Sequence, residues 1–383
     1  MRGLYIHIPF CRQACRYCDF FFSVSLKYQD EFVEKLLIEI NERSLSIQDS
    51  EVSSLYLGGG TPSLLTQGNL NRILKDVRKL YRLNTNAEIT IECNPEDLDR
   101  AYLECLQSTG INRLSIGIQS FRDEELRLLH RSHTADKAYR SVNEAAAAGF
   151  DNITVDLIYG IPGQSAEDWK KNLEQTLSLP VSHISAYHLT FEQGTVFEHW
   201  RKKGKLKPPE EELSLQMYGI LREQLISNGF EHYEISNFAM PGRRSLHNQG
   251  YWSGAPYMGF GPSAHSFDGV YRSWNKSSLK GYMDGISGGE PVQDSERLTR
   301  RERYHDYLIT SLRTSGGADL EYILDQFGPD TRKYFENAIE PYIADGTVKI
   351  SSGKAIINPG RWLISDHILR NLFLGDKGPV TDS

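Results

Sequence analysis

Three cysteines, Cys11, Cys15 and Cys18, lie within eight residues at the end of the first apolar run of this 383-residue chain. Because their number is odd and their spacing is short, they cannot form a disulfide framework. A structural zinc ion would need a fourth soft ligand, and the two other cysteines, Cys93 and Cys105, stand alone in the sequence. Three thiolates on one short loop suit a [4Fe-4S] cluster in which one iron has no protein ligand and stays open to a small molecule. We therefore expect the triplet to hold such a cluster, with zinc as the less favoured alternative.

The C-x3-C-x2-C spacing, with Tyr17 before the last cysteine, resembles the signature of the radical S-adenosylmethionine (SAM) superfamily. In that superfamily the amino and carboxylate groups of SAM chelate the open iron, so the resemblance implies both cofactors. The wider string Tyr5-Ile6-His7-Ile8-Pro9-Phe10-Cys11 resembles the oxygen-independent coproporphyrinogen oxidases and their relatives. Those oxidases have a fourth cysteine two residues after the third, whereas this chain has Phe20 there. The difference points to the sister group, the HemW family of heme chaperones.

Strand-like apolar runs alternate with helical patterns through the first half of the chain. Six such runs are expected to be strands, at residues 4–9, 52–57, 88–93, 113–118, 152–159 and 183–189. Six β-α units predict an α/β fold with a parallel sheet, either doubly wound or closed towards a barrel. The superfamily resemblance implies the second form, a partial (β/α)6 radical SAM barrel.

The pattern changes after about residue 210, and three regions are expected. Residues 1–230 form the radical SAM core, residues 231–290 form an extension of the barrel, and residues 291–383 form a HemN-type carboxyl-terminal domain. The last region has a hairpin pattern at 348–350 and 355–357 after several helices, which predicts a small α+β, winged-helix-like domain. A packing or lid role is favoured for it over DNA binding, because the chain is acidic.

Composition excludes several kinds of partner. The formal net charge of -7 argues against nucleic acid, which needs a basic face. No apolar run reaches the roughly 18 residues that a membrane span needs, so any membrane association is expected only through a partner. An oxygen-sensitive cluster needs a reducing compartment, and cysteines without a paired framework agree with this. We expect a cytoplasmic protein.

Polar residues near the ends of the predicted strands form a candidate SAM site. Gly58-Gly59-Gly60 follows the second strand, where glycines let backbone groups approach a ligand closely. Glu92 is placed to accept hydrogen bonds from ribose hydroxyls, and Arg131 to pair with a carboxylate. Each of these residues alone is more often an ordinary barrel or surface residue. The resemblance to the coproporphyrinogen oxidase family implies the following SAM contacts: Tyr5, Tyr17, Gly59, Gly60, Thr61, Glu92, Gln119, Arg131 and Asp156.

A second motif lies in the predicted extension. His247-Asn248-Gln249-Gly250-Tyr251-Trp252 resembles the H-N-x-x-Y-W motif of heme chaperones. Imidazole is a common axial ligand of heme iron, and aromatic rings stack on flat macrocycles. His247 is therefore the predicted heme ligand, with a packed loop residue as the alternative, and His265 is a weaker candidate.

The sequence favours a heme chaperone that carries a SAM-binding [4Fe-4S] cluster and passes heme to an acceptor protein. The alternatives are radical SAM enzymes that act on a porphyrin, either a coproporphyrinogen III dehydrogenase or a heme-degrading methyltransferase. Phe20 counts against the first alternative, and the H-N-x-x-Y-W string favours the chaperone over both. Whether SAM is cleaved is left open.

Overall fold

The structure is a computed structural model that describes residues 2–47 and 50–375. Its centre is a 12-stranded sheet, in which six consecutive strands run parallel and in chain order. They are β1 (Gly3–Ile8), β2 (Glu51–Gly59), β3 (Arg82–Cys93), β4 (Arg113–Gln119), β5 (Ile153–Tyr159) and β6 (His183–His188). This order confirms the predicted α/β fold with a partial (β/α)6 barrel.

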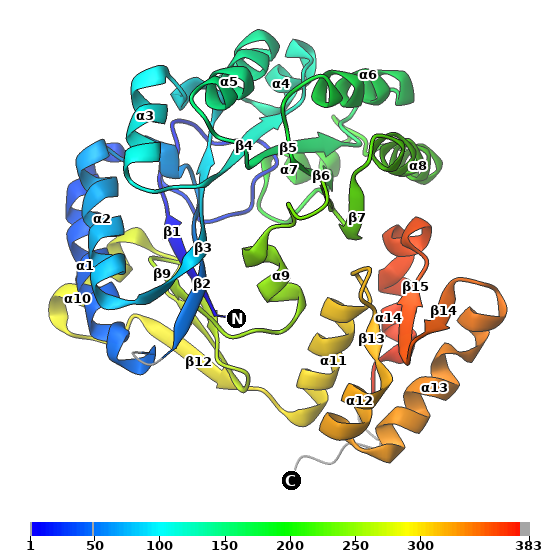
Figure 1. The fold of residues 1–383 in the computed structure, drawn as a ribbon. Coiled ribbons are helices and arrows are strands. Elements are labelled where there is room, and N and C mark those ends of the chain that lie inside the picture. Colours follow the sequence, from blue (N-terminus) through cyan, green and yellow to red (C-terminus); the bar gives the residue numbers. More distant parts are fainter. Residues whose placement is uncertain (1, 48–49, 376–383) are drawn as a thin grey trace.

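Helices connect these strands and lie on the outer side of the curved sheet (Figure 1). Their apolar residues recur at helical spacing, so that α1 buries Phe32, Leu36 and Ile40 against the sheet. Local signals fix the helix ends, as in α6, where Ser165 and Asp168 form a capping box. The connecting helices are α1 (Gln29–Ser44), α2 (Gln67–Leu80), α3 (Arg100–Ser108), α4 (Asp123–Leu129), α5 (Ala135–Ala147) and α6 (Ala166–Leu177).

The sheet continues beyond both ends of the parallel part. Next to β1 lie β9 (Tyr257–Phe260), β10 (His265–Phe267), β11 (Tyr271–Asn275) and β12 (Gln293–Arg297). Next to β6 lie β8 (Asn237–Ala239) and β7 (Glu231–Glu234), which form an antiparallel pair. The helices α7 (Val196–Lys202), α8 (Glu211–Ser227), α9 (Leu246–Trp252) and α10 (Leu279–Gly288) belong to this part of the chain. Figure 1 shows α9 on the open side of the barrel, where it packs on β2.

The carboxyl-terminal part forms a separate small module. Its three-stranded sheet has the order β13 (Ala318–Asp319), β15 (Lys354–Ile357) and β14 (Val348–Ser351). The antiparallel pair β14–β15 confirms the predicted hairpin. Four helices surround this sheet: α11 (Arg300–Ser311), α12 (Leu320–Phe327), α13 (Pro329–Ala344) and α14 (Ser365–Leu372). The module contacts the barrel at the β7–β8 turn, where the Ile235 amide donates to the Arg313 carbonyl at 3.0 Å.

Short 3₁₀ segments complete the chain at Leu26–Tyr28, Leu45–Ile47, Pro62–Leu64, Pro95–Asp97 and Pro359–Ile364. No helix within the described ranges is both long enough and apolar enough to cross a membrane. The parallel strands β1 to β6 all end at one edge of the sheet, so residues that follow these strands are brought together there.

Candidate functional site

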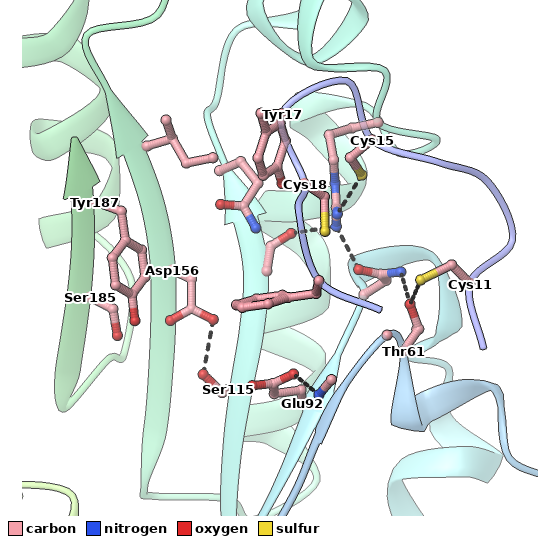
Figure 2. A pocket seen from close by; sticks show the side chains of 18 of the residues that line it. Cys11, Cys15, Tyr17, Cys18, Thr61, Glu92, Ser115, Asp156, Ser185 and Tyr187 are labelled. Atoms are coloured by element: carbon pink, nitrogen blue, oxygen red, sulfur yellow. Dashed lines mark hydrogen bonds between the residues drawn. The ribbon is translucent and has the colours of Figure 1, made fainter. Parts of the chain in front are cut away.

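A cavity of about 470 Å³ lies inside the partial barrel, which is within the size range of small-molecule sites. The three cysteine thiols face it from one side, and Glu92 and Asp156 face it from the strands (Figure 2). The structure brings most of the predicted site residues to this cavity: Cys11, Cys15, Tyr17, Cys18, Gly59, Gly60, Thr61, Glu92, Gln119, Arg131 and Asp156. Tyr5, His247 and His265 are not among the residues that line it.

The cysteine loop is closed at its base by backbone pairing. The Cys11 amide donates to the Ser23 carbonyl at 3.0 Å, and the Ser23 amide donates to the Pro9 carbonyl at 2.6 Å. His7 adds a third tie, because its Nε2 donates to the carbonyl of Phe21 at 2.9 Å. The chain between these points therefore leaves the sheet and returns to it, which turns the cysteines towards the cavity.

The far end of the loop rests on the carboxyl end of α4. The Arg16 amide donates to the Leu129 carbonyl at 3.2 Å, and its guanidinium donates to the Leu128 carbonyl at 3.0 Å. His130 donates through Nδ1 to the Ala14 carbonyl at 2.7 Å. The last carbonyls of a helix have no partner within the helix, so the loop satisfies them and is held in return. Hydrogen bonds thus fix the cysteine loop both at its base on the sheet and at its far side on α4.

The cysteine thiols have polar neighbours, but they are not grouped closely enough to bind one metal ion. The Thr61 hydroxyl donates to Cys11 Sγ at 3.6 Å, and Arg131 Nη1 donates to Cys15 Sγ at 3.5 Å. Burial raises the pKa of Cys18 to about 12 and also raises the pKa of Cys11, so a metal must displace a proton there. Among the described residues, no three His, Cys, Asp or Glu side chains are grouped closely enough to hold one metal ion. A four-iron cluster binds each thiolate through a different iron, so three separate thiols facing one cavity fit a cluster better than a single ion.

The glycine motif allows other parts of the protein to pack closely against its backbone. A Cβ on Gly59, whose φ is 107°, would lie 2.6 Å from the His7 ring, and a Cβ on Gly60 would lie 2.7 Å from the Phe10 carbonyl oxygen. The Gly60 amide also donates to the Ile8 carbonyl at 2.8 Å. The motif was predicted from its freedom to approach a ligand, and the observed close approach is to β1 and the start of the cysteine loop. Gly59 and Gly60 also line the cavity, so the motif borders both β1 and the cavity.

Glu92, near the end of β3, is held by two donors from β2. The Tyr56 hydroxyl donates to Oε1 at 2.8 Å, and the Gly59 amide donates to Oε2 at 3.1 Å. Burial raises the Glu92 pKa to about 7, and these hydrogen bonds oppose the rise. The carboxylate keeps lone pairs for a further donor, which suits the hydroxyl groups of a bound nucleoside.

Asp156 lies on β5, across the cavity from the glycine motif. The Ser115 hydroxyl on β4 donates to its Oδ2 at 2.9 Å, and Ser185 faces it from the paired position on β6. Burial raises the pKa of Asp156, and the hydrogen bonds from Ser185 and Ser115 oppose that rise. Figure 2 shows Tyr187 beside this carboxylate. Asp156 and its neighbours therefore form a polar wall opposite the cysteine loop.

Arg131 connects Asn94 and β4 to the cysteine loop. Its Nη2 donates to Asn94 Oδ1 at 2.5 Å and to the Gly117 carbonyl at 2.9 Å, while Nη1 faces Cys15. Its Nε is buried and has no hydrogen-bond partner within the described part of the chain. Such a donor is uncommon, because most buried polar groups in folded proteins have a hydrogen-bond partner.

Gln119 has a left-handed backbone conformation, with φ of 69°, at a register shift between β4 and β5. Such a conformation costs roughly 1 kcal/mol in a residue other than glycine, and irregularities of this kind re-aim side chains next to active sites. Gln119 thus combines a strained backbone with a position on the cavity wall.

Several lining residues were missed by the sequence analysis. Tyr56 holds Glu92, while Ser115, Ser185 and Tyr187 surround Asp156. Ser185 could have been found from strand order, since it pairs with Asp156 in the predicted parallel sheet. Tyr56 gave no such signal because it lies in the middle of a strand rather than at its end.

His247 lies on α9, outside the cavity and 4% exposed. Its Nδ1 is 3.0 Å from the Ser54 hydroxyl, and its Nε2 is 3.0 Å from the Tyr251 hydroxyl. Both ring nitrogens are thus engaged within the protein. Tyr5 stands beside it, with ring centroids 6.4 Å apart, and its hydroxyl donates to His7 Nδ1 at 3.2 Å. His265 is exposed on β10 with its ring near Trp274.

Comparison with known proteins agrees with this geometry. Residues 5–175 match the Radical SAM superfamily model, and residues 298–357 match the HemN C-terminal domain model. The heme chaperone HemW of Bacillus subtilis is 31% identical over 379 residues, which is 98% of this chain and 100% of that protein. The chain belongs to the HemW family. This membership confirms the resemblance that Phe20 and the H-N-x-x-Y-W string indicated.

A eukaryotic protein and a solved structure are also similar to this chain. The mouse protein radical S-adenosyl methionine domain-containing protein 1, mitochondrial, is 37% identical over 337 residues, covering 85% of this chain and 76% of its own length. Among solved structures, coproporphyrinogen III oxidase (HemN) from Escherichia coli, a radical SAM enzyme, matches with a TM-score of 0.84 at 27% identity. That match covers 97% of this chain and 90% of the oxidase. The barrel and the carboxyl-terminal module are therefore common to HemW proteins and the oxidase.

Proposed function

We propose that this protein is a heme chaperone that holds a [4Fe-4S] cluster on Cys11, Cys15 and Cys18, binds SAM beside it, and transfers heme to an acceptor protein. The observation that carries the proposal is the single cavity shared by the three thiols, the carboxylates of Glu92 and Asp156, and the guanidinium of Arg131. Membership of the HemW family supports the heme part.

Each polar group has a role in this proposal. The cluster, when bound, supplies an open iron for the amino and carboxylate groups of SAM. Arg131 faces the cysteine loop and lines the cavity, where its guanidinium pairs with a carboxylate. Glu92 accepts hydrogen bonds from ribose hydroxyls, and its orientation is fixed by Tyr56 and Gly59. Gln119 and Asp156 complete the polar wall, and Tyr17, Gly60 and Thr61 line the cavity close to the cysteines.

Heme would meet an apolar surface next to this cavity. Phe20 lines the cavity and is 66% exposed, and Phe22 lines it two residues further on. Large exposed aromatic side chains suit a flat macrocycle, which stacks on rings. The motif predicted His247 as an axial ligand, but that role would require its ring to give up the hydrogen bond to Ser54 or to Tyr251.

In this proposal the protein works in the cytoplasm, and its partners are heme and a heme-acceptor protein. Nucleic acid is not expected as a partner because the chain carries a net charge of -7. Any contact with a membrane would go through the acceptor.

Anaerobic reconstitution followed by two separate assays tests the proposal. The Cys15→Ser variant is expected to lose the cluster chromophore, whereas the matched control Cys93→Ala, buried on β3, is expected to keep it. The reconstituted protein is expected to bind heme, seen as a Soret band, and to leave coproporphyrinogen III unchanged. A cluster that survives in Cys15→Ser and is lost in Cys93→Ala would contradict the ligand assignment.

A second candidate is a radical SAM enzyme that acts on a porphyrin. The likeness to the Escherichia coli oxidase over 97% of this chain favours it. Phe20, in the position of the oxidase's fourth cysteine, counts against a coproporphyrinogen III dehydrogenase, and a heme-degrading methyltransferase is the other form. Steady decarboxylation of coproporphyrinogen III, or loss of the heme absorption with SAM consumption, would support this candidate over the chaperone.

A further inference from the structure

Helix α9 is anchored to the barrel by a buried carboxylate. Glu88 on β3 accepts hydrogen bonds from the Ser245 hydroxyl at 3.0 Å and from the backbone amides of Leu246 and His247 at 3.0 and 3.1 Å. Glu88 in turn lies 3.8 Å from the buried guanidinium of Arg113. The first turn of α9 is therefore fixed, and with it the position of the H-N-x-x-Y-W motif.

The His247 ring is locked on every side. The Ser54 and Tyr251 hydroxyls engage its two nitrogens, and burial lowers its pKa to about 3, so the ring is neutral. A neutral imidazole has one donor and one acceptor nitrogen, and both are used here. The ring has no free lone pair to offer in this arrangement.

The same ring stacks on Tyr56. The two ring centroids are 4.9 Å apart and the planes differ by 23°, and the Tyr5 ring is stacked 6.2 Å from that of Tyr56. The Tyr56 hydroxyl donates to Glu92 Oε1 at 2.8 Å. Tyr56 therefore has its ring held by the H-N-x-x-Y-W motif and its hydroxyl directed at the proposed SAM site.

We propose that His247 is a positioning residue for the SAM site: its ring fixes the Tyr56 ring, and Tyr56 fixes the Glu92 carboxylate. This inference rests on the proposed function, because it takes Glu92 as a SAM contact. It gives the H-N-x-x-Y-W motif a role behind the SAM-binding wall. Asn248, the next residue of the motif, lines the cavity directly.

A double-mutant cycle on the anaerobically reconstituted full-length protein tests the inference, with SAM affinity measured by calorimetry. Tyr56→Phe removes the hydrogen bond to Glu92 and is expected to weaken SAM binding about tenfold, which corresponds to about 1.4 kcal/mol. His247→Ala is expected to weaken it by a similar factor, and the double variant to weaken it no further than Tyr56→Phe alone. Independent effects that multiply would overturn the inference.

Two replacements separate the ring from the hydrogen bonds. His247→Phe keeps a ring against Tyr56 and is expected to retain SAM affinity within about threefold, whereas His247→Gln keeps polar groups without a ring and is expected to lose it. A folded His247→Phe variant that loses SAM affinity as fully as His247→Gln would contradict the stacking role. His265→Ala, at an exposed site on β10, is the matched control and is expected to leave SAM affinity unchanged.

The heme spectrum gives the second readout. All three His247 variants are expected to keep the Soret band of the unsubstituted protein. A shifted Soret band together with unchanged SAM affinity would overturn the inference and favour direct ligation of heme by His247. If the unsubstituted protein with its cluster does not bind SAM at all, the proposed function fails and the inference fails with it. Unaltered SAM binding in His247→Ala overturns the inference alone.

Discussion

Replacement of Gly60 by alanine tests how the glycine motif shapes the site. The new Cβ would lie 2.7 Å from the Phe10 carbonyl oxygen and 2.9 Å from both the Ile8 carbonyl oxygen and the Phe10 amide nitrogen. All three are backbone atoms of β1 and the start of the cysteine loop, so no side-chain rotation relieves the contact. The two segments must open by about 0.7 Å to bring the shortest contact from 2.7 Å to an ordinary 3.4 Å.

The Gly60→Ala substitution should lower both the stability of the fold and the yield of cluster assembly. Overpacking of this kind costs roughly 1–3 kcal/mol, so we expect Gly60→Ala to lower the free energy of unfolding by that amount in urea titrations. A shift of about 0.7 Å also exceeds the roughly 0.5 Å within which a working site must be held. Anaerobic reconstitution is therefore expected to give less cluster absorbance per chain than the unsubstituted protein.

Gly68 provides the matched control for this substitution. It lies in α2, and a Cβ there would meet nothing within 4 Å. Gly68→Ala is expected to stabilise the protein by roughly 0.5–1 kcal/mol, because alanine favours a helix over glycine. Full cluster content and an unchanged free energy of unfolding in Gly60→Ala would refute the reasoning from backbone contacts.

Three further predictions concern titration and strain. Burial and the nearby Asp156 raise the Glu92 pKa to about 7, and hydrogen bonds from Tyr56 and Gly59 oppose the rise. SAM affinity should therefore rise with pH from 6 to 8, as Glu92 ionises. Calorimetry should find no such rise in Glu92→Gln. Burial also raises the Glu234 pKa to about 7, above its unfolded value of 4.5, so ionisation destabilises the fold. Stability should fall by up to about 1.4 kcal/mol per pH unit between these values, and denaturant titrations of Glu234→Gln should show a shallower fall. Gln119→Gly should relieve the left-handed strain and stabilise the ligand-free protein by up to about 1 kcal/mol in the same titrations, while calorimetry finds weaker SAM binding.

The parts of the site that the sequence predicted are those with short-range signals. The cysteine triplet is defined by its own spacing. Glu92 and Asp156 were predicted as SAM contacts from the family resemblance, and Glu92 also from its place near the end of a predicted strand. The hairpin of the carboxyl-terminal module was predicted from turn residues between two β-branched runs. For the triplet and the hairpin, the deciding pattern lies within a few residues.

What could not be predicted depends on which distant segments meet. Tyr56 lies mid-strand in β2, and a barrel strand buried on both faces has no alternation that reveals its inward side. The sequence predicted His247 as a ligand from its motif, but the partners Ser54 and Tyr56 lie almost two hundred residues earlier in the chain. Likewise, nothing local to Gly60 indicates that the Phe10 backbone packs on it.

Several features that cost stability lie around the cavity. Glu92 and Asp156 are buried acids with raised pKa values, Gln119 has a left-handed backbone, and the Arg131 Nε lacks a partner within the described chain. Burial of a charge or a donor without a partner is unfavourable unless another group compensates it. The strands and helices that carry these residues follow ordinary patterns of apolar spacing and capping. Buried acids, a strained backbone and an incompletely paired donor that share one cavity are typical of a binding site, which agrees with the proposed binding of SAM there.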